Sequence, residues 1–229
     1  MFSGKTIIVT GAAGNVGSAL AGLMAARGAV VAAVDTYKPR LDEVVAALPG
    51  KGHMALSSYD LTDPAAAQAL VAHVVATSGR LDGVGTTVGG FAMAKLADAG
   101  LDQWELMFKL NVKTTWNIYQ AAVPAIGKGG ALVGIGSVAG LKAGAEVAAY
   151  AASKAAVMRM TESLAEELRG QKIRVNAVLP TTIDTPQNRA AMPDADTSRW
   201  VTPTEVGEAM AFLLSGAASG VTGQLLQVG

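Results

Sequence analysis

The chain has 229 residues, of which 51% are hydrophobic and 16% charged, a composition typical of a globular protein with a full core and not of a disordered one. Its 18 basic residues balance 18 acidic ones, so no charge surplus indicates a nucleic-acid partner. Cysteine is absent, which excludes a disulfide framework and a cysteine nucleophile, and we expect a cytoplasmic protein.

Short β-branched runs alternate with longer helical patterns along the chain. In chain order, strands are expected at 6–10, 29–35, 53–60, 81–89, 130–137, 172–180 and 225–229. Helices are expected at 15–27, 64–78, 102–127, 146–169 and 204–215. Several strands are apolar on both faces, as in a parallel sheet covered on both sides. The pattern predicts an α/β protein, a single-domain Rossmann fold over 1–229 with a doubly wound parallel sheet of about seven strands.

Neither a membrane-spanning segment nor a metal site is expected from the sequence. The longest apolar stretch, 129–141, is too short and too rich in glycine to span a bilayer, and the apolar run at 6–10 is too short for a signal peptide. His53 and His73 stand far apart without other ligand-type residues nearby. We therefore expect no membrane partner and no metal site.

A glycine-rich turn follows the first expected strand. Residues 10–17 read TGAAGNVG, and Gly11, Gly14 and Gly17 lie where the strand passes into a helix. Such a turn lets backbone N–H groups approach a pyrophosphate, and the helix N-terminus adds positive potential. Glycines can also serve only to close a tight bend, so dinucleotide binding is a hypothesis at this point.

Acids end the next two expected strands. Asp35 lies 35 − 17 = 18 residues after Gly17, close to the interval of about 20 at which an acid binds a dinucleotide ribose. A carboxylate there repels a 2′-phosphate, so NAD is predicted in preference to NADP. Asp60 ends the third strand. Because Asp63 before Pro64 is the better helix cap, Asp60 is free to meet the adenine.

Residues 150–154 read YAASK within an alanine-rich helical pattern. Tyr150 and Lys154 are one helical turn apart, so both side chains leave the same face of the helix. Such a pair is common on ordinary helix surfaces. It also suits a phenol that transfers a proton with the help of an ammonium group.

Taken together, these features resemble the short-chain dehydrogenase/reductase family over essentially the whole chain. The resemblance rests on TGAAGNVG, Asp35, YDL at 59–61, NV at 111–112, GIGSVAG at 134–140, YAASK and LPTTIDT at 179–185. It implies an NAD(P)-dependent oxidoreductase that transfers a hydride between nicotinamide and a small carbonyl or secondary-alcohol substrate.

The resemblance also implies catalytic roles. Tyr150 is the general acid/base, Lys154 lowers the pKa of its phenol and binds the nicotinamide ribose, and Ser137 bonds the substrate oxygen. A free phenol has a pKa near 10, and a nearby ammonium favours its charged form. Asn111 is expected to hold a water that links Lys154 to solvent. It could also be a helix-interior residue bonded to the backbone, and both descriptions can be true.

The residues around the two ligands follow from the same resemblance. Expected cofactor-binding residues are Gly11, Gly14, Asn15, Val16, Gly17, Asp35, Asp60, Leu61, Val88, Gly89, Gly90, Tyr150, Lys154, Pro180, Ile183 and Thr185. Expected substrate-binding residues are Phe91, Met93, Ala139, Ala145, Thr181 and Met192. A lid at about 182–200 is expected to exclude water from the hydride transfer.

Three segments depart from the family pattern. Asn15 follows Gly14 where smaller members carry a later glycine, a spacing closer to that of epimerase-type members. TTVG stands at 86–89 in place of NNAG. The lid resembles the dihydropteridine reductase branch, which gives an alternative: reduction of a quinonoid pterin with NADH. That branch lacks the serine, so Ser137 favours a carbonyl substrate.

Other classes of function stay open at this stage. A regulator on the same fold would bind NAD without turnover, and an epimerase or dehydratase would not consume NADH. The set of Ser137, Tyr150 and Lys154 favours the oxidoreductase. Family members usually form tetramers or dimers through two long helices, here 102–127 and 146–169, so we expect a homo-oligomer, as a homotetramer or a dimer.

Overall fold

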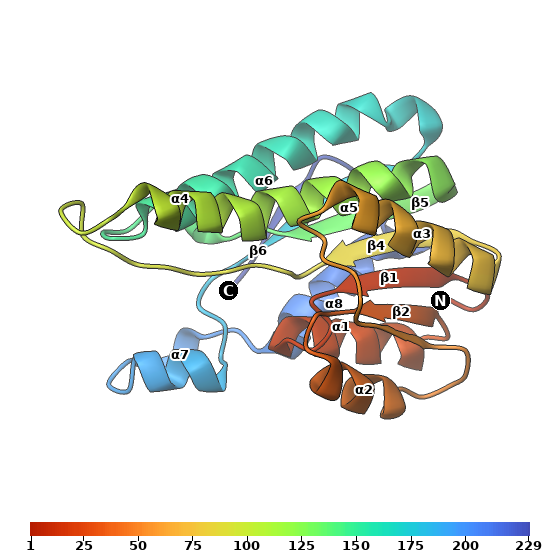
Figure 1. The fold of residues 1–229 in the computed structure, drawn as a ribbon, viewed down its shortest axis with the longest axis horizontal. Coiled ribbons are helices and arrows are strands. Elements are labelled where there is room, and N and C mark those ends of the chain that lie inside the picture. Colours follow the sequence, from red (N-terminus) through yellow and green to blue (C-terminus); the bar gives the residue numbers. More distant parts are fainter.

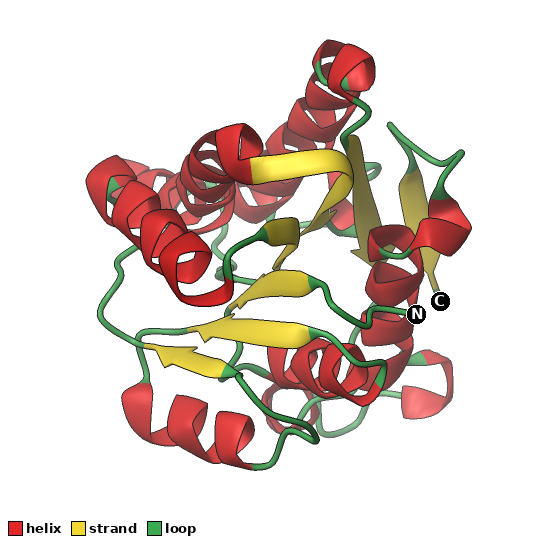
Figure 2. Ribbon diagram, turned by 90° about the vertical axis from the view of Figure 1, so that its right-hand side faces the viewer, coloured by secondary structure: helices red, strands yellow, loops and turns green.

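A parallel sheet of seven strands runs between two layers of helices in the computed structural model, which describes residues 1–229 (Figures 1 and 2). The strands are β1 (Thr6–Thr10), β2 (Val30–Val34), β3 (Met54–Leu56), β4 (Leu81–Thr86), β5 (Ile126–Ile135), β6 (Arg174–Pro180) and β7 (Leu225–Val228). Their spatial order is β3-β2-β1-β4-β5-β6-β7, and every neighbouring pair is parallel. The strand order reverses between β1 and β4, which is where ligands bind in sheets of this kind.

Eight α-helices connect and cover the strands. They are α1 (Asn15–Ala26), α2 (Lys38–Ala46), α3 (Pro64–Ser78), α4 (Leu101–Met107), α5 (Thr114–Ala122), α6 (Ala148–Glu167), α7 (Pro186–Ala191) and α8 (Pro203–Leu214). A π-helical turn, Phe108–Lys113, joins α4 to α5. No helix has both the length and the hydropathy needed to cross a bilayer.

Helices cover both faces of the sheet, which explains why its central strands are largely apolar on both sides. In β1, Ile7 and Val9 belong to the core cluster shared with α1 and α8, whereas Ile8 belongs to the cluster shared with α3 and α5. Successive side chains of a strand point to opposite faces, so a strand covered twice has no polar face. The predicted α/β fold with a doubly wound parallel sheet is confirmed.

Most expected elements differ from the structure by a few residues at their ends, and helices α2 and α7 were not predicted. The expected helix 102–127 is divided into α4, the π-helical turn and α5, and its last residues belong to β5. The expected strand 53–60 shortens to Met54–Leu56. Helix α2 was not predicted, because its apolar residues are few; only Leu41 and Val44 are buried there.

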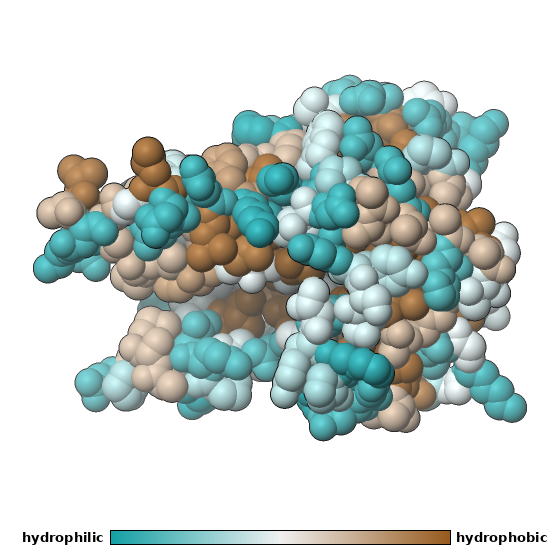
Figure 3. All heavy atoms as spheres, in the orientation of Figure 1, coloured by the Kyte–Doolittle hydropathy of each residue, from teal (hydrophilic) through white to brown (hydrophobic).

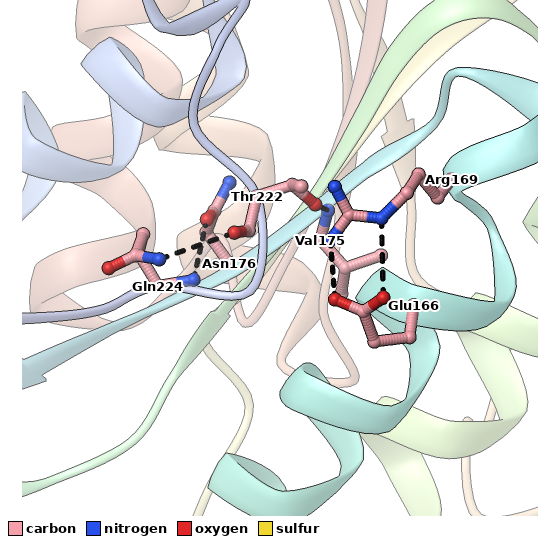
Figure 4. Close-up of polar contacts among 6 residues, drawn as sticks. All are labelled: Glu166, Arg169, Val175, Asn176, Thr222 and Gln224. Atoms are coloured by element: carbon pink, nitrogen blue, oxygen red, sulfur yellow. Dashed lines mark hydrogen bonds and ion pairs between the residues drawn. The ribbon is translucent and has the colours of Figure 1, made fainter.

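Asn176 secures the last strand beside β6 (Figure 4). This fully buried residue of β6 donates from Nδ2 to the Val221 carbonyl (3.0 Å) and accepts at Oδ1 from the Gln224 amide (3.0 Å). Thr222 Oγ1 accepts from the Val175 amide (3.1 Å). These bonds hold the connection before β7 against β6, so that β7 extends the sheet as far as the carboxyl end of β6.

Candidate active site

The turn after β1 has a shape that only glycine permits. Gly11 has a φ of +68°, and a Cβ added there would lie 2.7 Å from Thr87 Oγ1. A Cβ at Gly17 would lie 2.0 Å from the Gly11 carbonyl oxygen. Helix α1 begins at Asn15 with no acidic side chain in its first turn, so its first amide groups are available to an anion. The turn is therefore shaped for a phosphate group.

Asp35 ties this turn to the end of β2. Its Oδ2 accepts from the Ala13 amide (3.0 Å), and its Oδ1 accepts from the Tyr37 amide (3.0 Å). Each carboxylate oxygen keeps a further lone pair, so the group can still accept hydrogen bonds from ribose hydroxyls. The predicted ribose acid is thereby held in place at the C-terminal edge of the sheet.

Asp60 is less free than the sequence suggests. Its Oδ1 accepts from the Thr62 amide (2.9 Å). Hydrogen bonds from Thr62, followed by the charges of Lys109 and Lys113, hold the pKa of the Asp60 carboxyl below its ordinary value. The predicted helix cap is correct, because Asp63 accepts from the Ala65 amide (2.9 Å) at the start of α3.

A cavity of about 310 Å³ lies between these residues and β4. The expected cofactor residues that line it are Gly11, Gly14, Asp35, Asp60, Leu61, Val88 and Gly89. Its other lining residues are Val34, Thr36, Tyr59, Thr62, Thr87, Leu110 and Thr114. An acid at the end of β2, a glycine turn beside a helix N-terminus and a mixed apolar wall could hold the adenosine and diphosphate part of a dinucleotide.

Lys154 is buried beneath Tyr150 at the start of α6. It is 5% exposed, its Nζ donates to the Ile135 carbonyl at the end of β5 (3.1 Å), and Nζ lies 5.9 Å from the centre of the Tyr150 ring. Ser137 follows β5 and accepts from the Ala139 amide (3.2 Å). The structure thus brings Ser137, Tyr150 and Lys154 together where β5 ends.

Burial moves the pKa values of the pair in opposite directions, so the pKa of the Tyr150 phenol lies above that of the Lys154 ammonium. Burial lowers the pKa of Lys154 from 10.5 to about 8. Burial raises the pKa of Tyr150, and the Ser137 side chain opposes that rise. Desolvation of the ring is the larger of these two effects on the phenol. The lowering of the phenol pKa that the resemblance implies for the cofactor complex stays a prediction.

Asn111 holds the backbone after β4. Its Oδ1 accepts from the Gly90 amide (2.8 Å), and its Nδ2 donates to the Gly90 carbonyl (3.1 Å) and to Ser153 Oγ (2.8 Å). Its own carbonyl accepts from Thr115 Oγ1 (3.1 Å). The side chain is therefore bonded to backbone and to Ser153, one of the two roles expected from the sequence. The water-holding role stays a prediction.

One exposed aromatic side chain packs against Tyr150, and the other expected substrate residues differ in exposure. The Phe91 ring packs edge-on against Tyr150 with centroids 4.9 Å apart, and Phe91, Met93 and Met192 are all exposed. Ala139 is half-buried and Ala145 exposed. Figure 3 shows a hollow between the surface over α4 and α6 and the surface over α7, with hydrophobic residues on its floor. A substrate could enter here.

The residues after β6 lie at the same edge of the sheet. Pro180 ends β6 and is buried; Ile183 forms a bridge with Val201. Thr185 is 9% exposed, and its Oγ1 accepts from the Asn188 amide (3.2 Å) as the cap of α7. The Thr181 hydroxyl is buried without a hydrogen-bond partner, so it offers no exposed surface to a substrate.

Two residues that sequence reasoning missed are part of this arrangement. Ser153 is fully buried between Asn111 and the Tyr150 carbonyl, to which its Oγ donates (2.7 Å). Thr87 Oγ1 donates to the Thr10 carbonyl (2.8 Å) and so joins β4 to the glycine turn. The position of Ser153 directly before Lys154 was the available signal.

No group of three or more His, Asp or Glu side chains could hold a metal ion.

Comparison with known proteins agrees with this geometry. A family model described as enoyl-(acyl carrier protein) reductase matches residues 11–229. The 3-oxoacyl-(acyl-carrier-protein) reductase of Thermotoga maritima is 35% identical over 240 residues, which cover 98% of this chain and 96% of that protein. The D-threitol dehydrogenase of Mycolicibacterium smegmatis is 33% identical over 236 residues, 96% of this chain and 89% of that protein.

A solved structure gives the same result for the fold. A short-chain dehydrogenase from Burkholderia cenocepacia in complex with NADP superposes with a TM-score of 0.92 at 32% identity, covering 99% of this chain and 97% of that one.

Fold and site define a nicotinamide-dependent oxidoreductase acting on CH–OH or C=O groups. The chain belongs to the short-chain dehydrogenase/reductase family. The resemblance of its lid to the dihydropteridine reductase branch stays a prediction.

Gly17→Ala tests the glycine turn. The new Cβ would meet the Gly11 carbonyl at 2.0 Å, so the turn must open, and we expect NADH affinity to fall at least tenfold. Gly22→Ala is the matched control in the same helix, because a Cβ there meets nothing within 4 Å. Titration of NADH fluorescence measures both; equal affinities would contradict the phosphate-binding role.

Proposed function

We propose that this protein transfers a hydride between NAD(H) and a small ketone or secondary alcohol, with Tyr150 moving the proton. The observation that carries the proposal is the burial of Lys154 beneath Tyr150, beside Ser137 and next to the nucleotide cavity. Bound nicotinamide would supply or accept the hydride. Burial of an ammonium group beside a phenol lowers the stability of the folded protein, so a purely structural role does not explain it. The same pair is useful for proton transfer.

Each residue then has one task. Tyr150 donates the proton to the carbonyl oxygen during reduction, and its raised pKa keeps the phenol protonated at neutral pH. Lys154 carries its charge below about pH 8 and stabilises the phenolate left behind. Ser137 is placed to hold the substrate oxygen. Asn111 and Ser153 fix the backbone at Gly90, on the cofactor side of Lys154.

A carbonyl substrate is favoured over a quinonoid pterin. Ser137 accepts from the Ala139 amide, so its hydroxyl hydrogen can be given to a substrate oxygen. The exposed Phe91 ring, which packs against Tyr150, suits an apolar group beside the reacting carbon. A screen of NADH oxidation with ketones and quinonoid pterin, and of NAD reduction with secondary alcohols and sugars, would distinguish these substrates.

The cofactor is proposed to be NAD in preference to NADP. Asp35 supports this, because its carboxylate lines the cavity beside the glycine turn and both of its oxygens are held by backbone amides. A negative charge there repels a 2′-phosphate and accepts bonds from ribose hydroxyls.

We further propose that residues 182–200 act as a lid on the single domain formed by residues 1–229. We also propose that the protein works in the cytoplasm.

A homo-oligomer, a homotetramer or a dimer, is also proposed. Trp104, Phe108 and Trp116 are partly exposed along α4, the π-helical turn and α5 at intervals of helical turns. Trp116 and Leu164 line an apolar hollow of about 210 Å³ between α5 and α6. Large aromatic side chains exposed in a row are typical of interfaces, and these elements include both long helices expected to form one.

Tyr150→Phe tests the proton donor. We expect kcat to fall at least a hundredfold with NADH binding unchanged, because the ring stays and only the hydroxyl is lost. Tyr119→Phe is the matched control: Tyr119 is also buried, but its hydroxyl faces Thr86 at 3.5 Å and does not line the nucleotide cavity, so kcat should be unchanged. Full activity of Tyr150→Phe would refute the assignment.

Asp35→Asn tests the choice of cofactor. The variant keeps an acceptor oxygen and loses the charge, so the ratio of the KM for NADPH to the KM for NADH should fall about tenfold. Asp42→Asn, on the exposed face of α2, should leave that ratio unchanged. A wild-type enzyme that prefers NADPH would show that the ribose assignment is wrong.

A further inference from the structure

Residues 186–200, here called the lid segment, are attached to the protein mainly at their base. Ile183 pairs with Val201, and the Asp184 amide donates to the Val201 carbonyl (2.7 Å). Asn188 Nδ2 donates to the Ile183 carbonyl (2.8 Å). Helix α7 has no buried residue, and Figure 1 shows it standing apart from the helices that flank the sheet. Packing alone therefore holds this segment weakly.

One bond fastens the free part of the lid segment to the body. Asn15 Nδ2 donates to Gln187 Oε1 over 3.0 Å. No other hydrogen bond or ion pair joins 186–200 to any residue outside 181–202; the Arg189–Asp184 ion pair lies within that range. The Asn15–Gln187 bond therefore ties the beginning of α7 to the start of α1, beside the glycine turn.

Asn15 lies next to the nucleotide cavity without lining it. It is the first residue of α1 and follows Gly14, which lines the nucleotide cavity. Its side chain is exposed and reaches across to the second residue of α7. A glycine at position 15 has no side chain and could make no such contact. This chain thus has Asn15 where the family usually has glycine, and the Asn15 side chain makes the contact that holds the unusual lid.

We propose that Asn15 and Gln187 form a latch that holds the lid segment across the cofactor crevice, so that cofactor release requires this bond to break. The part concerning the cofactor rests on the proposed NAD(H) function, whereas the fastening of the lid segment does not. One exposed hydrogen bond has a modest effect, so we expect changes of about fivefold when it is removed.

Limited trypsin digestion of the ligand-free protein tests the fastening. Arg189 and Arg199 are exposed cleavage sites within the lid segment, and cleavage after Arg169 gives an internal reference outside it. Asn15→Ala and Gln187→Ala should each speed lid cleavage about fivefold, and the double variant should be no faster than either. The exchanged pair, Asn15→Gln with Gln187→Asn, keeps the combined length and should restore slow cleavage.

Stopped-flow release of NADH, followed by its fluorescence, tests the consequence for the cofactor. The same single variants should release NADH about fivefold faster, and the exchanged pair should return to the wild-type rate. Thermal unfolding of each variant shows whether the fold is intact, because both side chains are exposed and their loss should leave Tm within a few degrees.

The two readouts separate the latch from the proposed function. If lid cleavage is faster in the variants but neither the wild type nor any variant binds NADH, the proposed function is refuted and the fastening stands. Normal NADH binding with unchanged cleavage would overturn the latch. Faster cleavage with unchanged NADH release would overturn its role in cofactor release, and additive effects in the double variant would show that the two residues act separately.

Discussion

The burial of one ammonium group without a carboxylate partner is the constraint around which this site is built. Lys154 Nζ has the Ile135 carbonyl as its hydrogen-bond acceptor and the Tyr150 ring above it, and no acid pairs with it. Two glycines make room for this arrangement. A Cβ at Gly89 would lie 3.3 Å from Nζ, and a Cβ at Gly140 would meet the backbone of α6 at Ala155 within 2.9 Å. Strand ends and helix α6 are thereby brought close enough to enclose the charge.

This burial has an energetic cost at neutral pH. The pKa of Lys154 falls from 10.5 to about 8, so the charged form is destabilised in the folded protein relative to the unfolded chain. The penalty is fully present below about pH 8 and fades as the pH rises toward 10.5, where both states are neutral. A charge kept at this cost is understandable in a catalytic site, where stability is given up for chemistry.

Much of the fold could be predicted from the sequence, because apolar runs without a polar face specify strands covered by helices on both sides. The glycine turn, Asp35 and the Tyr150–Lys154 pair were also visible as spacings along the chain. The π-helical turn around Asn111 and the short helix α2 were not, since neither has a distinctive apolar period. Contacts between distant segments, such as Asn111 with Ser153 and Asn15 with Gln187, depend on tertiary packing and leave no local pattern. The burial that raises the pKa of Tyr150 depends on the same packing and is likewise not visible in a sequence.

The most direct test of this account is an NMR titration of the Lys154 side chain in protein labelled with ¹³C at its lysines, with Lys154→Met used to assign the signal. The account predicts a midpoint at about pH 8, well below the other lysines, and a Lys154→Met protein that is more stable than the wild type at pH 7. A midpoint near the ordinary value of 10.5, with no gain in stability in the variant, would contradict it.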